Sequence, residues 1–137
     1  MKKAIKHDAG KSPMHLVSPE FMFALGGVLK HGADKYGERN WETENGMDWS
    51  RLYAAAQRHL WAWWAGEDDD PESGRSHIDH ASACLMMLSH YAKNSDVFSS
   101  DDRPNSVKAV SGQHIRPHHV YPAEVEHPSP VGRTSED

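Results

Sequence analysis

The sequence predicts an all-α fold, a small helical bundle of three main helices. Apolar residues recur at helical spacing in three stretches, about residues 18–36, 48–65 and 76–92. The strict alternation of apolar and polar residues that marks half-buried strands is almost absent. The connections between the stretches are short and polar, which is typical of neighbouring helices in a bundle.

The first helix is expected to begin after Ser18. Serine is a favoured N-cap residue, Pro19 suits the first helical position, and Glu20 places a negative charge near the positive end of the helix dipole. The apolar stripe of this helix consists of Phe21, Leu25, Val28 and Leu29. Cap and stripe together predict a helix over about residues 18–36.

The second helix is expected from near Asp48 to about Ala65. Projected at about 100° per residue, four of its side chains fall within about 60° of arc and would face the core. These four are Leu52, Ala56, His59 and Trp63. A histidine therefore lies on the predicted core face.

The third helix is expected to begin at Ser76. Asp79 follows three residues later, which is the spacing of a capping box. The predicted core stripe consists of His77, His80, Ala81, Cys84, Leu85 and Leu88. Cys84 lies in the middle of this stripe and is better explained as a core residue than as a nucleophile.

The composition changes near residue 94. All five tryptophans and all six methionines precede this point, whereas five of the eight prolines follow it. We expect a helical domain over residues 1–93 and a mostly disordered tail over residues 94–137, because the tail offers little apolar area to offset its ordering entropy. A core of this size is small, which favours a homo-oligomer.

Charge and cysteine content exclude several classes of protein. The single cysteine excludes an internal disulfide framework and fits a reducing compartment, so a cytoplasmic protein is expected. The net charge of −5 argues against binding to nucleic-acid polymers. No apolar run reaches the roughly 20 residues of a membrane helix, so no membrane partner is expected.

The surplus negative charge lies in one connection, between the second and third helices. From Glu67 to His80, six acidic residues and one basic residue, Arg75, give a net charge of −5, equal to that of the whole chain. The acidic residues are Glu67, Asp68, Asp69, Asp70, Glu72 and Asp79. Such a cluster is repulsive unless water screens it or a cation occupies it, and carboxylate oxygens suit Mg²⁺ or Mn²⁺.

Three histidines are expected near this acidic loop. His77 and His80 leave one face of the third helix, and His59 lies on the core face of the preceding helix. They could converge on one metal ion together with loop carboxylates. Alternatively, His59 is a hydrogen-bonded core residue, the other two bond backbone or water, and Asp79 only completes the capping box.

A second group of polar and aromatic residues precedes the second helix. Lys35 could contact phosphate, Tyr36 or Trp41 could stack on a base, and Asn40 could hydrogen-bond its edge. The alternative is a helix end followed by a tryptophan that anchors a loop to the core. Lys11 likewise lies either in a phosphate-binding arm or in a solvated terminus.

Two blocks of the sequence form a recognisable pattern. The first block reads Lys6-x-Asp8-x-Gly10-Lys11 and then Gly32-Ala33-x-Lys35-Tyr36-Gly37-x-x-Asn40-Trp41. The second reads Arg58-His59-x-x-Ala62-Trp63-x-x-Gly66-Glu67-Asp68-x-Asp70-x-Glu72-Ser73-Gly74-x-x-His77-x-x-His80-Ala81. Over roughly residues 6–92 these blocks resemble one known family, the dATP/dGTP diphosphohydrolase N-terminal domain family of bacteriophages, which is similar to the MazG-like all-α nucleotide pyrophosphohydrolases.

The resemblance implies hydrolysis of deoxynucleoside triphosphates of the dATP/dGTP type to the monophosphate and pyrophosphate, with Mg²⁺ or Mn²⁺ as cofactor. The catalytic residues would be Glu67, Asp70 and His77. The metal ligands would come from His59, Glu67, Asp70, Glu72, His77 and His80. The substrate would be held by Lys11, Lys35, Tyr36, Asn40, Trp41 and Arg58.

The sequence departs from the MazG pattern of Glu-x-x-Glu on one helix and Glu-x-x-Asp on the next. His59 and His77-x-x-His80 stand at these positions, and the acids lie in the loop between them. This departure implies a metal displaced toward the loop, an active site of a different kind, or a loss of activity.

Two other functions remain open at this stage. One is a phosphohydrolase that releases a different product, although Asp79-His80 reverses the order of the His-Asp dipeptide that such enzymes use. The other is a non-enzymatic helical protein that binds a partner or uses a metal for structure alone, since five tryptophans in 93 residues could form a protein interface as readily as a nucleotide pocket.

Overall fold

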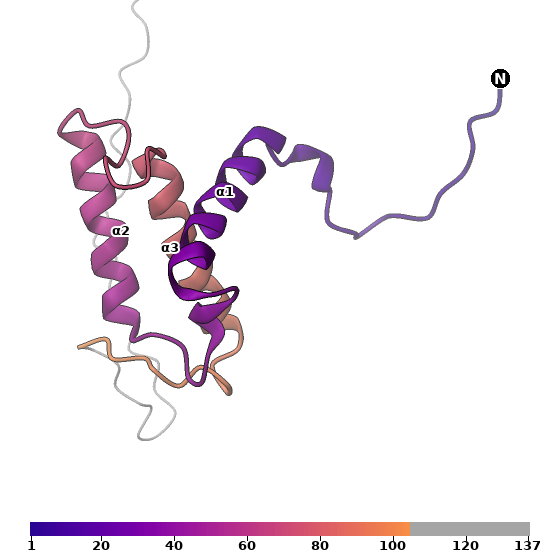
Figure 1. The fold of residues 1–137 in the computed structure, drawn as a ribbon. Coiled ribbons are helices and arrows are strands. Elements are labelled where there is room, and N and C mark those ends of the chain that lie inside the picture. The colour runs from indigo at the N-terminus through magenta and orange to yellow at the C-terminus, as the bar shows by residue number, and fades with distance from the viewer. Residues whose placement is uncertain (105–137) are drawn as a thin grey trace, which may run out of the picture. The chain divides into compact units, whose positions relative to one another are not determined.

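The computed structural model describes residues 1–104, and three α-helices dominate them (Figure 1). They are α1 (Pro19–Tyr36), α2 (Trp49–Trp64) and α3 (His77–Lys93), with short 3-10 helices at Met14–Leu16 (η1) and Asn40–Glu42 (η2). The described part of the chain contains no strand, only one isolated bridge between Asp69 and Ser76. The all-α prediction is confirmed, and each helix boundary lies within one residue of its predicted place.

Helix α3 is the central helix of this bundle. It packs against α2 along one side and against α1 along another (Figure 1). The chain runs in opposite directions in α2 and α3, so the end of α2 meets the start of α3. This antiparallel pairing brings the connection between the two helices to one end of the bundle.

Two of the helix starts are capped as the sequence predicts. The Ser18 side chain accepts a hydrogen bond from the backbone N–H of Phe21 at 3.3 Å, and Pro19 opens α1. The Ser76 side chain accepts one from the N–H of Ile78 at 3.1 Å, but among residues 1–104 no hydrogen bond of the Asp79 side chain completes the predicted capping box. Such caps satisfy backbone donors that lack a partner inside the helix.

Helix α2 is capped by a residue from a distant part of the chain. Asp48 occupies the N-cap position, but its side chain makes no capping bond. Instead, the carboxylate of Asp102 accepts hydrogen bonds from the backbone N–H of Ser50, at 2.8 Å, and from the Ser50 hydroxyl. A segment that the sequence assigned to the tail thus completes the start of α2.

The main apolar core lies where α2 begins and α3 ends. It is formed by Trp49, Leu52, Tyr91 and Phe98, all buried. Tyr91 is fully enclosed, and its hydroxyl donates to the carbonyl of Trp41 and accepts from the N–H of Met47 at 3.1 Å. Both partners belong to the segment between α1 and α2, so Tyr91 fastens that segment to α3.

Gly46 shows how closely the backbone approaches this tyrosine. Its φ is +76°, and a Cβ placed there would lie 2.6 Å from the Tyr91 ring. Only glycine fits both the left-handed backbone and the contact.

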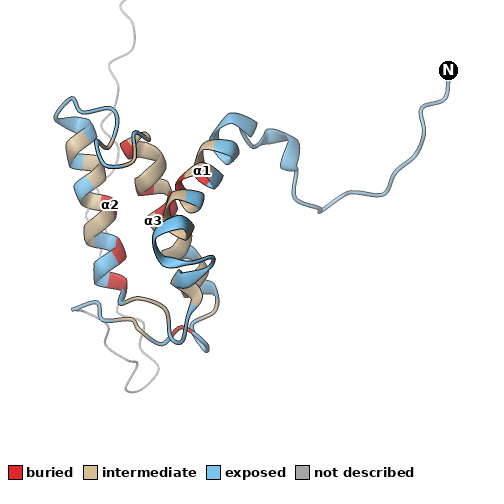
Figure 2. Cartoon of the chain, in the orientation of Figure 1, coloured by how far each residue is buried: buried red, intermediate tan, exposed pale blue. Residues whose placement is uncertain are grey.

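A smaller apolar cluster joins α1 to α3. Leu25 and Val28 of the predicted stripe are buried against Ala83. The first turns of α1 are exposed (Figure 2), so Phe21 does not contribute to the core as predicted. Leu85 is also exposed, with 53% of its surface accessible, because α1 and α2 cover other sides of α3.

The packed part of the chain extends past the boundary predicted at residue 93. Phe98 is only 6% exposed, and the Ser100 hydroxyl donates to the carbonyl of Met47 at 2.9 Å. One phenylalanine on a core edge outweighs the polar composition around it. The rest of the predicted tail, residues 105–137, lies outside the described residues. Within residues 1–104, no helix has the length and apolar character needed to cross a membrane.

Candidate metal centre

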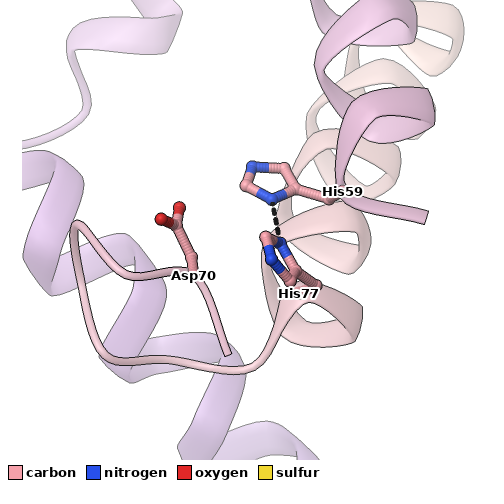
Figure 3. Close-up of side chains that lie close together, drawn as sticks. All are labelled: His59, Asp70 and His77. Atoms are coloured by element: carbon pink, nitrogen blue, oxygen red, sulfur yellow. Dashed lines mark hydrogen bonds between the residues drawn. The ribbon is translucent and has the colours of Figure 1, made fainter. Parts of the chain in front are cut away.

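The connection between α2 and α3 places a carboxylate beside two histidines. His59 comes from the last turns of α2, His77 is the first residue of α3, and Asp70 lies on the loop between them (Figure 3). One ligand atom from each of the three residues lies within 4.8 Å of the other two. The predicted convergence of histidines with a loop carboxylate is therefore present in the structure.

Backbone hydrogen bonds hold this loop in shape. The N–H of Asp70 donates to the carbonyl of Arg75 at 2.8 Å, and the N–H of His77 donates to the carbonyl of Asp68 at 2.9 Å. The side chain of Asp70 also accepts from the N–H of Glu72 at 2.9 Å. Asp70 is thus fixed in position by the loop itself, before any ligand is present.

Hydrogen bonds also determine which nitrogen of His77 faces the cluster. Its Nε2 lies 2.7 Å from the carboxylate of Glu67, and its Nδ1 lies 2.8 Å from Nδ1 of His59. A carboxylate only accepts, so the neutral His77 ring carries its proton on Nε2 and presents a lone pair at Nδ1. The His59 ring then donates from Nδ1. Glu67 therefore orients His77, as carboxylates orient metal-binding histidines in many proteins.

His80 lies beside the three residues but has another partner. Its ring stacks on that of His59, with centroids 4.6 Å apart and planes 10° from parallel. Its Nε2 is hydrogen-bonded to the Ser73 hydroxyl at 2.6 Å and lies 3.8 Å from Asp70 Oδ2. His80 thus supports the His59 ring and stays within reach of the carboxylate.

Glu72, another predicted ligand, is paired with a lysine. Its carboxylate forms an ion pair with Lys35 at the end of α1, and this contact lowers the pKa of Glu72 and raises that of Lys35. Both side chains are exposed, so the pair contributes little stability. Its consequence is positional, because it joins the acidic loop to α1 and brings Lys35 close to the cluster.

A fourth histidine near the cluster was not predicted from the sequence. His31 of α1 meets His80 edge-on, with ring centroids 6.2 Å apart. The signal was present in the sequence, since His31 follows the buried Val28 by three residues and precedes Lys35 by four, which places all three on adjoining turns of one face.

The charge states in the cluster suit metal binding. Burial lowers the pKa of His59 and of His80 below the ordinary value, which favours neutral imidazoles with free lone pairs. The hydrogen bond from the N–H of Glu72 lowers the pKa of Asp70 and keeps it ionised. Metal ligands must be deprotonated, and these residues are so at neutral pH.

The predicted substrate-binding residues are divided between two regions. Lys35 and Tyr36 end α1 beside the acidic loop, and Arg58 is an exposed neighbour of His59. Lys11 forms a turn with Asp8 ahead of α1, and among residues 1–104 no hydrogen bond or ion pair joins it to the histidines.

Asn40 and Trp41 lie toward the opposite end of α3. The Trp41 ring meets His90 edge-on at 5.1 Å between centroids, and Tyr91 binds the Trp41 carbonyl. Fourteen residues of helix separate Tyr91 from His77, about 21 Å. Trp41 therefore anchors a loop to the core, which is the alternative that the sequence left open.

The comparisons agree with the resemblance seen in the sequence. The family model described as dATP/dGTP diphosphohydrolase, N-terminal, matches residues 1–102. A Salmonella phage PMBT28 protein named dATP/dGTP diphosphohydrolase is 37% identical over 99 residues, which cover 72% of this chain and 32% of that protein. The chain thus spans about a third of the length of this curated relative. No solved structure matches the chain.

Proposed function

Since the chain belongs to the dATP/dGTP diphosphohydrolase N-terminal family, we propose that it hydrolyses dATP and dGTP to the monophosphate and pyrophosphate with a divalent metal ion. The observation that carries this proposal is the grouping of His59, Asp70 and His77 around one point. The relative named for this activity is about three times as long as the matched segment, so the proposal assigns the chemistry to the part that the two proteins share.

The donor set fits a metal such as Mn²⁺. Two imidazole nitrogens and a carboxylate oxygen are available, and manganese accepts both kinds of ligand, whereas Mg²⁺ prefers oxygen alone. A divalent ion at such a site supplies charge neutralisation for phosphoryl oxygens and activates water. His59, Asp70 and His77 would hold it, and His80, whose Nε2 lies 3.8 Å from Asp70 Oδ2, could add a ligand after a rotation of its side chain.

Glu67 has two roles in this proposal. Its hydrogen bond to Nε2 of His77 keeps the Nδ1 lone pair directed at the metal position. Its carboxylate remains exposed to solvent, so it can also accept the proton that the attacking water loses. Asp70 is held ionised by the loop backbone and contributes negative charge beside the metal position.

Cationic side chains flank the cluster on two helices. Lys35 of α1 reaches the acidic loop, and Arg58 of α2 is close enough to His59 to help lower the pKa of that ring. Within residues 1–104, no acidic side chain pairs with Arg58. Arg58 is thus available for the phosphates of a triphosphate substrate, and Lys35 would reach them by exchanging its ion pair with Glu72. These substrates occur in the cytoplasm of a bacterium or a phage-infected bacterium, where we place the protein.

The proposal is tested by product analysis. The protein is incubated with each of the four deoxynucleoside triphosphates and Mn²⁺ or Mg²⁺, and pyrophosphate and monophosphate are measured. We expect both products from dATP and dGTP, strong loss in His59→Ala and His77→Ala, and full retention in His15→Ala, an exposed histidine outside the cluster.

Two results would contradict the proposal. Release of inorganic phosphate or triphosphate would indicate a different reaction at the same site. No release above the level of the His77→Ala variant would leave a metal-stabilised structural role for the cluster.

A further inference from the structure

The last turn of α2 carries Trp63, which lies beyond the point where α3 begins. His59 contacts His77, which is the first residue of α3. Trp63 lies one helical turn further along α2, about 6 Å past His59, so α2 overhangs the start of α3 at this point. Trp63 accordingly keeps 41% of its surface exposed, although the sequence places it on the core-facing stripe.

Helix geometry places Trp63 on the same face of α2 as His59. Residues at i and i+4 share a helix face, so Trp63 lies on the face of α2 that carries His59, one turn further on, and its ring lies next to that of Trp64, with centroids 6.1 Å apart. Two other exposed tryptophans of the same helix are rotated away from His59. At about 100° per residue, Trp61 lies about 200° around the helix and Trp64 about 140°.

One tight turn couples Trp63 to the candidate metal centre. The carbonyl of Trp63 accepts a hydrogen bond from the N–H of Gly66 at 2.9 Å, and the carbonyl of Ala62 accepts one from the N–H of Glu67 at 3.0 Å. Glu67 in turn holds Nε2 of His77. The residue that orients a proposed metal ligand is thus hydrogen-bonded to Ala62, the neighbour of Trp63 in α2.

We propose that Trp63 is the platform on which the purine base of the substrate stacks while the phosphates lie at His59, Asp70 and His77. The inference rests on the proposed function and deepens it by naming the residue that receives the base. An exposed indole beside a phosphate site offers a flat π surface, which every nucleobase can use. It also supplies the aromatic contact that Trp41, about 21 Å away along α3, does not provide.

Stacking explains a substrate range of two purines. A π face does not read the hydrogen-bonding edge that distinguishes adenine from guanine, so one tryptophan accepts both. The two-ring purines cover more of the indole than a pyrimidine does. Trp63 therefore favours dATP and dGTP over dCTP and dTTP without selecting between the two purines.

The test uses the full chain and non-hydrolysable α,β-imido analogues of dATP and dCTP with Mn²⁺, and inorganic tripolyphosphate with Mn²⁺ as a ligand that has no base. Affinities are measured by calorimetry for the wild type, Trp63→Ala, Trp63→Phe and the matched control Trp61→Ala. Circular dichroism and light scattering establish that each variant keeps its fold and its mass.

We expect Trp63→Ala to weaken binding of the dATP analogue about 5- to 150-fold, with tripolyphosphate binding unchanged. Trp63→Phe should retain most of the affinity, and Trp61→Ala all of it. The dCTP analogue should bind more weakly than the dATP analogue to the wild type and lose less in Trp63→Ala.

Other outcomes separate the two proposals. If the wild type binds tripolyphosphate and nucleotide but Trp63→Ala changes neither, the base platform is wrong and the proposed function stands. Equal losses in Trp61→Ala and Trp63→Ala would also overturn the platform, as would a change of mass in Trp63→Ala, which would indicate an interface between copies. If the wild type binds neither ligand in the presence of Mn²⁺, the proposed function itself fails.

Discussion

Each end of the α2–α3 pair buries one ring, Tyr91 at one end and His77 at the other, but the surroundings of the two rings differ. At one end, Tyr91 is enclosed by apolar rings, and both hydrogen bonds of its hydroxyl go to backbone groups. At the other end, His77 is equally buried, but its nitrogens meet a second histidine and a carboxylate that stay partly in solvent. Tyr91 belongs to the apolar core, whereas His77 belongs to the candidate metal centre.

The difference indicates which end contributes stability to this small bundle and which end carries the candidate metal centre. Apolar burial at the Tyr91 end is strongly favourable, and the polar groups there have permanent partners. At the histidine end, burial penalises the charged rings, and the partners of His77 can be exchanged for a metal ion. The two opposite ends of one helix pair would thus serve different purposes, one the stability of the fold and the other the proposed binding of a metal ion.

The largest expected effect is on the stability of the apolar end. Tyr91→Ala removes a fully buried ring and leaves the Trp41 carbonyl and the Met47 N–H without their partner. We expect a loss of about 3–5 kcal/mol in the free energy of unfolding, measured by urea denaturation. Leu85→Ala, an exposed position on the same helix, is the control and should change it by less than about 0.5 kcal/mol. Equal effects at the two positions would mean that this end is not the core.

Replacing a histidine of the candidate metal centre should abolish metal binding. His77→Ala takes away the ring that lies between Glu67 and His59, so Mn²⁺ should no longer raise the melting temperature. Thermal unfolding with and without Mn²⁺, and after addition of a chelator, measures this. His15→Ala should respond to Mn²⁺ as the wild type does. An undiminished shift in His77→Ala would place the metal elsewhere.

A smaller effect should follow from changing the residue that orients His77. Glu67→Gln keeps an oxygen that accepts from Nε2 but removes the charge, and we expect Mn²⁺ affinity to fall about 10- to 100-fold. Calorimetric titration measures the change. A complete loss, as in His77→Ala, would show that Glu67 binds the metal directly. An unchanged affinity would show that Glu67 neither binds the metal nor orients His77 for it.

The apolar end can also be weakened through its cap. Asp102→Ala removes the acceptor for the backbone N–H and hydroxyl of Ser50, at the first turn of α2. We expect a cost of about 0.5–2 kcal/mol in the free energy of unfolding, measured by urea denaturation. The exposed Asp96→Ala should have little effect. A neutral Asp102→Ala would mean that the segment after α3 does not stabilise α2.

The smallest effect should appear as a dependence of stability on pH, measured without metal. Burial holds the pKa of His59 and of His80 below the ordinary value of about 6.5, so the unfolded chain binds more protons than the folded one. Stability should therefore decrease as the pH falls below about 6.5 toward the folded-state pKa values. Melting temperatures of the wild type and His80→Gln between about pH 7.5 and 5.5 measure it, a range that spans about one unit on each side of 6.5. If the melting temperatures of the two proteins change with pH in parallel, His80 does not contribute to the pH dependence.

Much of the fold follows from local rules and was predictable. Ser18 and Ser76 cap helices because an N-cap depends on a residue and the three that follow it. The approach of His59 to His77 was predictable as well, because a short loop between two helices forces them to run antiparallel. The composition argument misplaced the domain boundary, because one buried ring, Phe98, decides whether a polar segment packs.

The sequence by itself determined the three helices, the acidic loop and the meeting of two histidines with that loop, since each depends on residues close together in the chain. Only the tertiary structure decided that Trp41 anchors a loop while Trp63 stays partly exposed, and which acid orients His77 while another pairs with Lys35. These outcomes depend on where α1 and α3 end relative to α2. Helical periodicity specifies a face of a helix, but it does not specify how far a neighbouring helix covers that face.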